Sequence, residues 1–333
     1  MLYSFAITPE VFEPWFAPDG TAEGRILTEL LRGLCDNGIL ADLHAGQWLT
    51  QVRRCLDNNK SPPDLRDKIN SCLAVLSKRN RLVRHPASSE RPETEEYRWL
   101  HWALERHGHD PEGSFQAIVS SEEFIAFSTL QSDALMPIQT ILDAPCWLER
   151  KRSVRFEKTE ANLRVLLAPI IRHASKLILI DPYMTCRKER FFETVRHATS
   201  LLGRHFDPPR KGRIDIHAGD PTEDKDGLCE TVRERLDRWK TELGPEAKHF
   251  CKEFHVYLWG RKPGGKRFHD RYIITDQLGL GAPGGLDFGT DSLQANYTEW
   301  TWLEPCDVQE IVLTEFDKMK SPYRFLDMIK VLP

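Results

Sequence analysis

The sequence predicts an α/β protein with two domains: a mostly helical N-terminal domain over residues 1–150 and a mixed α/β domain over residues 155–333. Three observations support this prediction. Apolar residues recur at helical spacing in the first part of the chain. In the second part, short strand-like runs alternate with helical stripes. A charged segment near residues 147–156 separates the two parts.

The composition excludes several classes of protein. The chain has 333 residues, 40% of them hydrophobic, which is ample for buried cores, and its net charge of −4 does not indicate a nucleic-acid-binding protein, although a local basic patch could still bind one. No apolar run approaches the roughly 20 residues that span a bilayer. The N-terminus lacks a basic segment followed by an apolar one, so we do not expect secretion. The eight cysteines show neither CxxC pairs nor zinc-ligand spacing, and we therefore expect reduced thiols in a cytoplasmic chain.

Three apolar stripes predict the helices of the N-terminal domain. They run from Ile26 to Leu34, from Leu65 to Leu76 and, over a wider surface, from Tyr97 to Leu104. The polar stretch from Pro86 to Glu95 is expected to be an exposed loop. No carboxylate or cysteine is placed to complete a metal site with the histidines of this region, so we expect them to be core or surface residues. These histidines are His85, His101, His107 and His109.

In the second domain each element follows from its apolar pattern. Leu163 to Ala174 has apolar residues at helical offsets, and Pro169 is expected to kink this helix or mark its first turn. The run KLILIDPY is a short buried strand that ends at Asp181. The remaining expected elements are a basic helix at 187–202, a strand at 213–217, a helix at 228–243, a strand at 253–259 and a strand at 269–276. Helices between strands predict a sheet with parallel pairs and crossover connections.

The last of these strands carries the residues that indicate chemistry. His269, Arg271 and Asp276 have the spacing H-x-R-x4-D. On a strand, His269 and Arg271 point to the same face, so an imidazole and a guanidinium would lie together where the strand begins. Asp276 is expected to lie beyond the strand, in the following turn.

The residues on either side of the motif favour a phosphate site. Lys266 and Arg267 precede it, and a glycine-rich loop with Gly284 and Gly285 follows it. Cations, an imidazole and exposed backbone N–H groups are the groups that bind a phosphate ester. The glycines are equally consistent with a tight turn.

Asp181, Tyr183 and Asp287 are further candidates for the same site. Asp181 ends a predicted strand, and the carboxyl ends of strands border the ligand crevice in open α/β sheets. Asp181 either lines the cleft beside Tyr183 or caps the turn that follows its strand. Arg271 either binds phosphate or forms a salt bridge with Asp181 or Asp287. His269 serves catalysis, binds phosphate without turnover, or holds its own loop by hydrogen bonds.

The motif, the IDPYM segment, the RIDIH strand and the glycine loop, in this order, resemble the phospholipase D superfamily over about residues 155–333. The signature of that superfamily is H-x-K-x4-D followed by a glycine-rich stretch. Here Arg271 takes the lysine position, and GGLDF stands where a G-S-x-N element would follow. The chain is more similar to a divergent branch, which includes the phospholipase-D-like C-terminal domain of microtubule-interacting-and-trafficking proteins and prokaryotic relatives.

The resemblance implies a mixed sheet flanked by helices and a phosphodiesterase that uses neither a metal nor a cofactor. In catalytic members a histidine attacks phosphorus to form a phosphohistidine, and a histidine from a second motif protonates the leaving oxygen. By position, His269 is the nucleophile or the acid and Arg271 the phosphate clamp. Asp276 then supports the histidine. Arginine and lysine both bind phosphate but are not equivalent.

Because the chain has a single motif, several hypotheses stay open. In the first, two chains form the site as a homodimer, and the protein is a nuclease or other phosphodiesterase, by analogy in prokaryotic genome defence. In the second, the motif is degenerate and the domain binds nucleic acid or another phosphodiester polymer, a phospholipid headgroup or a protein partner, with the N-terminal domain docking a protein. A third makes the C-terminal domain a passive scaffold and places the function in residues 1–150. The basic residues from Arg187 to Arg213 form either a solvated face or a polyanion track.

Overall fold

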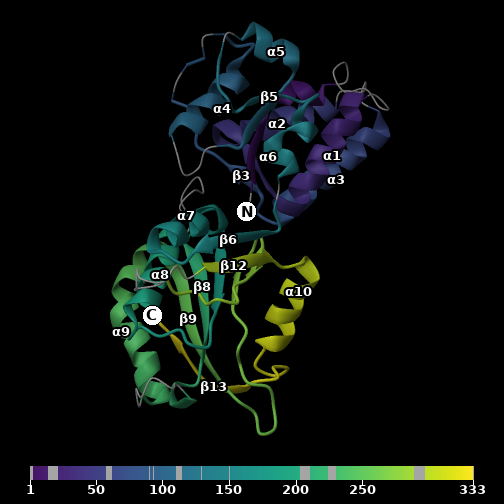
Figure 1. The fold of residues 1–333 in the computed structure, drawn as a ribbon. Helices are drawn as coiled ribbons and strands as arrows, with labels where there is room; N and C mark the ends of the chain where they lie inside the picture. The colour runs from purple at the N-terminus through teal and green to yellow at the C-terminus, as the bar shows by residue number, and fades with distance from the viewer. Residues whose placement is uncertain are drawn as a thin grey trace. The chain divides into compact units, whose positions relative to one another are not determined.

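The computed structural model describes residues 3–13, 22–57, 62–89, 91–92, 94–109, 115–128, 130–149, 151–202, 211–223, 230–288 and 297–332. The chain divides into two compact units, the first ending at Lys151 and the second beginning at Arg152. Both units combine helices with a sheet, so the chain is an α/β protein (Figure 1).

The first unit contains a parallel five-stranded sheet. Its strands have the order β3-β2-β1-β4-β5, and each neighbouring pair is parallel. Because the order reverses between β1 and β4, this is the arrangement of a doubly wound sheet. The strands are β1 (Tyr3–Ile7), β2 (Gly38–Asp42), β3 (Leu82–Arg84), β4 (Ala117–Ser120) and β5 (Leu135–Pro137).

Helices cover both faces of this sheet, with α1 and α3 on one side and α4 on the other (Figure 1). The α-helices are α1 (Ala22–Asn37), α2 (Leu43–Asp57), α3 (Pro63–Lys78), α4 (Arg98–His109), α5 (Glu122–Phe127) and α6 (Pro145–Leu148), and the short 3₁₀ turns are η1 (Pro9–Phe12) and η2 (Ile141–Asp143). The three predicted apolar stripes lie on α1, α3 and α4.

The expectation of a mostly helical first domain needs correction, because it overlooked the sheet. The strands are only three to five residues long. All five residues of β2 and all four of β4 are buried. Strands that are buried on both sides show no alternation of apolar and polar residues, so periodicity alone cannot separate them from helical segments.

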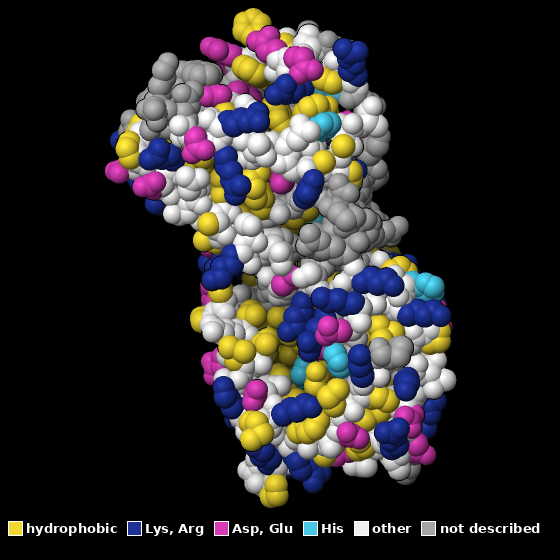
Figure 2. Space-filling model, turned by 180° about the vertical axis from the view of Figure 1, so that it is seen from behind, with side chains coloured by type: hydrophobic (Ala, Val, Ile, Leu, Met, Phe, Trp, Pro, Cys, Tyr) yellow, Lys and Arg dark blue, Asp and Glu magenta, His cyan; other side chains and the backbone are white. Residues whose placement is uncertain are grey.

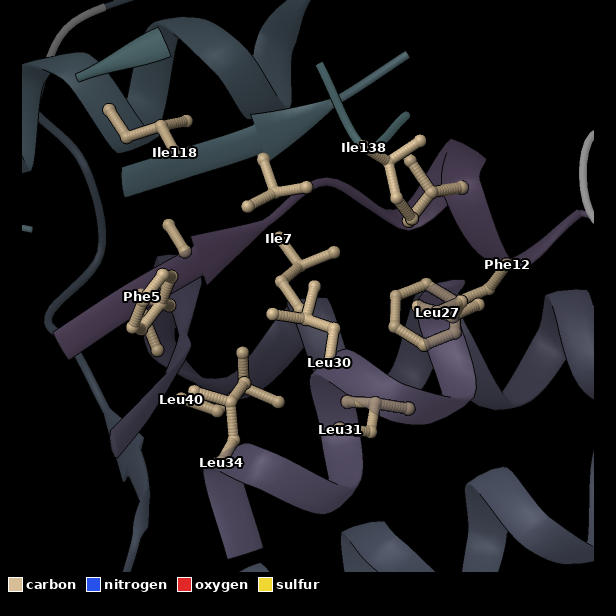
Figure 3. Packing of buried hydrophobic residues seen from close by; sticks show 14 of the residues in the cluster. Phe5, Ile7, Phe12, Leu27, Leu30, Leu31, Leu34, Leu40, Ile118 and Ile138 are labelled. Atoms are coloured by element: carbon tan, nitrogen blue, oxygen red, sulfur yellow. The ribbon is translucent and has the colours of Figure 1, made fainter. Parts of the chain in front are cut away.

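The core of the first unit forms where α1 packs against the sheet. Figure 3 shows Ile7 of β1 beside Leu30 of α1, and Leu40 of β2 beside Leu34 of α1. These side chains are buried. The apolar stripe of α1 therefore fixes the helix to the sheet by hydrophobic burial, at roughly 25 cal/mol per Å² of apolar surface removed from water.

The second unit contains a mixed eight-stranded sheet in the order β13-β9-β8-β7-β10-β11-β12-β6. The central strands β7, β8 and β9 are parallel, and the other neighbours are antiparallel. The strands are β6 (Ser153–Glu157), β7 (Lys176–Ile180), β8 (Gly212–Gly219), β9 (Cys251–Gly260), β10 (Tyr272–Thr275), β11 (Gly279–Gly281), β12 (Tyr297–Trp302) and β13 (Arg324–Lys330).

Helices lie on both faces of this sheet, with α7, α8 and α9 on one face and α10 on the other (Figure 1). They are α7 (Glu160–Ile171), η3 (Pro221–Glu223), α8 (Glu189–Leu201), α9 (Val232–Phe250), α10 (Pro305–Glu310) and the π-helical turn η4 (Ile311–Glu315). Pro169 lies in the last turn of α7 instead of its first. The Thr231 and Glu234 side chains form a capping box that begins α9.

Candidate anion-binding site

The site is built around Asp181, the residue that follows β7. Its side chain is buried, and its two carboxylate oxygens accept hydrogen bonds from the backbone N–H groups of Tyr183 (2.9 Å) and Leu286 (3.1 Å). The carboxylate thus holds the turn after β7 and the glycine loop after β11 together. Burial raises the pKa of Asp181 above its ordinary value, although both hydrogen bonds and Arg271 act in the opposite direction.

Two features give the glycine loop its tight shape: a positive φ at one glycine and a close neighbouring side chain at the other. Gly285 has φ +92°, a left-handed conformation that favours glycine. A Cβ on Gly284 would lie 2.2 Å from the Thr298 hydroxyl oxygen. Both glycines are therefore needed for the tight turn, and Gly285 N donates to the carbonyl of Ala282 at 2.9 Å within it.

Arg271 enters this site from the segment before β10. Its Nη1 donates to the carbonyl of Pro283 at 2.6 Å, and its Nε lies 3.7 Å from Asp181 Oδ1. Its guanidinium carbon is 5.2 Å from the centre of the Tyr183 ring. The ion pair that the sequence left open is thus made with Asp181, and Arg271 is fixed in place at the carboxyl end of β7.

Asp287 is held by two cations: Lys158, which the sequence did not single out, and Arg190, which belongs to the basic run from Arg187 to Arg213. Lys158 Nζ donates to Asp287 Oδ1 at 2.8 Å and to the carbonyl of Gly284 at 2.7 Å. Arg190 Nη1 lies 3.2 Å from Asp287 Oδ2. The Lys158 side chain is only 6% exposed. No motif contains Lys158, so only the pairing of β6 with the rest of the sheet could have identified it.

These groups surround a hollow of about 360 Å³ in the second unit. Figure 2 shows lysine and arginine side chains gathered with acidic and histidine side chains on one face of the molecule. Among the described residues that line the hollow, four side chains are cationic and two are acidic, so positive charge is in excess. The lining residues are Lys158, Asp181, Tyr183, Lys188, Arg190, Phe191, Arg271, Gly284, Gly285 and Asp287.

The first turn of α8 forms part of the rim. Lys188 is the N-cap of this helix, and Arg190 and Phe191 lie in its first turn. The first N–H groups of a helix have no partner within it, and the helix dipole is positive at this end. The amino end of α8 therefore adds to the attraction that the cationic side chains exert on an anion.

His269 does not line this hollow. It is exposed, lies before β10, which begins only at Tyr272, and makes no hydrogen bond or ion pair with any residue that the structure describes. The prediction that His269 and Arg271 open the strand is therefore wrong. Phe268, which directly precedes His269, packs against Phe316 and Tyr323 in a buried cluster that also contains Ile180 and Ile274 of the sheet.

The basic residues before the motif are placed differently from one another. Arg267 borders a small second hollow that shares Tyr183 with the first. Lys266 is exposed and lines neither of the two hollows. Of the described basic residues in the motif and just before it, only Arg271 lines the larger hollow.

Asp276 lies at the opposite end of the sheet from the hollow. Its carboxylate accepts hydrogen bonds from the backbone N–H of Ser175 (3.1 Å) and from the Ser175 hydroxyl. Because β10 runs antiparallel to β7, Asp276 lies near the amino end of β7. Asp181 follows the carboxyl end of the same strand, which has five residues and is roughly 16 Å long. Asp276 therefore cannot support His269, and the role that the resemblance gave it is corrected to holding the start of β7.

The remaining candidate groups carry no separate site. Within the described ranges, no three or more histidine, cysteine or acidic residues are grouped so as to hold a metal ion. His85 is buried, and its Nδ1 accepts from Arg106 Nε at 3.2 Å; the His109 side chain lies outside the described residues. Among the helices described, none combines the length and the apolar character needed to cross a membrane.

Comparison with known proteins gives little. No family model and no curated protein matches the chain. Among solved structures, it is similar to a phosphatidylserine synthase from Haemophilus influenzae Rd KW20, with 12% identity and a TM-score of 0.30 over 52% of this chain and 39% of that one. It is also similar to TrmBL2, an archaeal chromatin protein with a novel mode of DNA binding, with 14% identity and a TM-score of 0.26 over 56% and 60%. The matches span less than two thirds of either protein, and with such low scores neither carries an argument.

Proposed function

We propose that the second unit binds a phosphate-bearing ligand in the hollow at the carboxyl end of β7. The observation that carries this proposal is the convergence of Lys158, Lys188, Arg190 and Arg271 on one hollow. Guanidinium and ammonium groups are the side chains that bind phosphate most strongly. The amino end of α8 at the rim supports the same ligand.

The position of the hollow supports the proposal as well. It lies where β7 ends and the chain turns away from the sheet, the place where open α/β sheets bind ligands. Its floor is formed by the buried side chains of Lys158 and Asp181, whereas Lys188 and Arg190 are partly exposed. The floor therefore shapes the site, and Lys188 and Arg190 at the amino end of α8 are the residues that an incoming anion meets.

The test is to remove those two charges. In the variant with Lys188→Gln and Arg190→Gln, we expect the affinity for inorganic phosphate, measured by isothermal titration calorimetry, to fall at least about tenfold, since a hydrogen bond to a charged group contributes about 1.5–3 kcal/mol. The matched control carries Lys240→Gln and Lys252→Gln, which removes two exposed charges from α9 and β9. Equal affinity of the two variants, with unchanged circular dichroism, would refute the proposal.

A second candidate function is a phosphodiesterase assembled from two chains. The observation that favours it is His269, an exposed imidazole two residues from Arg271 that uses no described residue as a hydrogen-bond partner. Among the described residues that line the hollow there is no histidine. The hollow of one chain thus supplies binding groups, and hydrolysis through a phosphohistidine would need His269 from each of two copies.

A further inference from the structure

The charges around the hollow indicate which kind of phosphate it takes. Four cationic side chains face two carboxylates there, an excess of two positive charges. A phosphomonoester carries nearly two negative charges at neutral pH, because its second pKa is about 6. An internal phosphodiester carries one. Charge matching in a partly buried site therefore favours the monoester.

The contacts inside the site show how the carboxylate of Asp287 is already neutralised. The Lys158 ammonium already donates to Asp287 and to the carbonyl of Gly284, and it is nearly inaccessible. Asp287 is therefore largely neutralised by Lys158 alone. The Arg190 side chain, which also pairs with Asp287, is 37% exposed and can turn part of its guanidinium to a bound anion.

The buried residues that line the hollow point the same way. Its floor consists of the buried residues Lys158, Asp181 and Gly285, and Phe191 closes one side with a buried ring. A phosphate at the end of a molecule can reach such a floor while the rest of the molecule leaves through the mouth. A phosphate inside a chain has two substituents, and both would have to turn back past the rim.

We infer that the hollow recognises a terminal phosphate, the dianionic phosphomonoester group, in preference to an internal phosphodiester. This inference rests on the proposed function and narrows its ligand class. The same chemical group occurs at the phosphorylated end of a nucleic acid and on a lipid such as phosphatidic acid. The experiment therefore needs one arm for each source.

In the first arm, a short oligothymidylate carries a phosphate at its 5′ end, at its 3′ end or at neither, and binding to the full chain is measured by fluorescence anisotropy. In the second arm, phosphatidylcholine vesicles contain either phosphatidic acid, a monoester, or phosphatidylglycerol, a diester, and binding is measured by co-sedimentation. We expect the monoester form to bind at least about tenfold more tightly than its diester counterpart in one arm, which identifies the source. The preference should disappear when Lys188 and Arg190 are both changed to Gln.

The outcomes separate this inference from the proposal beneath it. Equal binding of monoester and diester in both arms, weakened by the Lys188→Gln and Arg190→Gln changes, would overturn the terminal-phosphate preference and leave phosphate binding in place. A monoester preference that survives both changes would move the recognition away from this hollow and would also overturn the inference. If neither inorganic phosphate nor any of these probes binds, both statements fail.

Discussion

His217 of β8 shows how strongly the sheet of the second unit controls a single side chain. It is buried, and the Trp259 indole N–H donates to its Nδ1 at 3.0 Å, which places the imidazole proton on Nε2. The Tyr257 ring stacks on it at 4.8 Å with an interplanar angle of 10°. Burial, aided by Lys176 and Arg213, lowers the pKa of His217 to about 3. The imidazole is thus a neutral core residue at physiological pH.

This lowered pKa predicts a loss of stability in mild acid. In the unfolded chain His217 takes up a proton as the pH falls through its ordinary value of about 6.5, whereas in the folded chain it stays neutral until about pH 3. The stabilisation is therefore complete above pH 6.5 and is lost as the pH falls toward 3. Between pH 7 and pH 5 we expect a contribution of about 2 kcal/mol to disappear.

The measurement is the free energy of unfolding in urea at pH 7 and pH 5, for the unmodified protein and for His217→Gln. Glutamine keeps an acceptor for Trp259 but does not titrate. The decrease between the two pH values should be smaller in the variant by about 2 kcal/mol, and other titrating groups cancel in the comparison. An equal decrease in both proteins would show that His217 is protonated in the fold.

At the scale of elements, the second unit was predictable in outline because its patterns are regular. The KLILI run became β7, and the apolar stripe from Leu163 became α7. The paired structure of the sheet was not readable, since strand order depends on contacts between residues far apart in the chain. Lys158 illustrates this limit. It follows β6 in the sequence, yet it pairs with Asp287, 129 residues away.

The first unit marks the other limit of sequence reasoning. Strong leucine stripes on α1 and α3 dominate its sequence, and they hide the strands between them. The strand β3 has only three residues, Leu82–Arg84. A strand this short carries too few residues for a recognisable pattern, and it is defined by its parallel pairing with β2.

The motif itself was only partly predictable. Its spacing singled out Arg271, which lines the hollow. It did not indicate that Asp276 lies away from the site, beside Ser175. The sequence predicted a strand over residues 269–276, whereas β10 spans only Tyr272–Thr275. The residue before this segment, Phe268, is buried and packs against Phe316 and Tyr323.

At the scale of the whole molecule, phosphate binding needs one chain, whereas hydrolysis through a phosphohistidine needs two. If two chains form a phosphodiesterase, hydrolysis of an oligonucleotide should proceed in EDTA and should be abolished by His269→Ala. Because His269 is exposed and makes no described hydrogen bond, this change should leave the thermal unfolding temperature unaltered. A double change of Lys240 and Lys252 to Gln serves as the control for loss of surface charge.

The oligomeric state decides how to interpret that experiment. Sedimentation of the active protein should show a dimer, and mixing His269→Ala chains with unmodified ones should reduce activity in proportion to the mixed dimers formed. Hydrolysis that continues in His269→Ala, or that starts only after a divalent metal is added, would exclude this phosphohistidine mechanism. Phosphate binding in the hollow would not be affected by either result.

The most direct test of the account is residue-specific, because its central claim is that one hollow binds phosphate. Inorganic phosphate is titrated into the ¹⁵N-labelled full chain, and backbone amide shifts are followed by NMR. We predict saturable shifts at Gly285 and at Glu189 and Arg190 in the first turn of α8, with the amides of α9 unchanged. Absence of shifts at these three residues, or saturable shifts confined to other parts of the chain, would contradict the account.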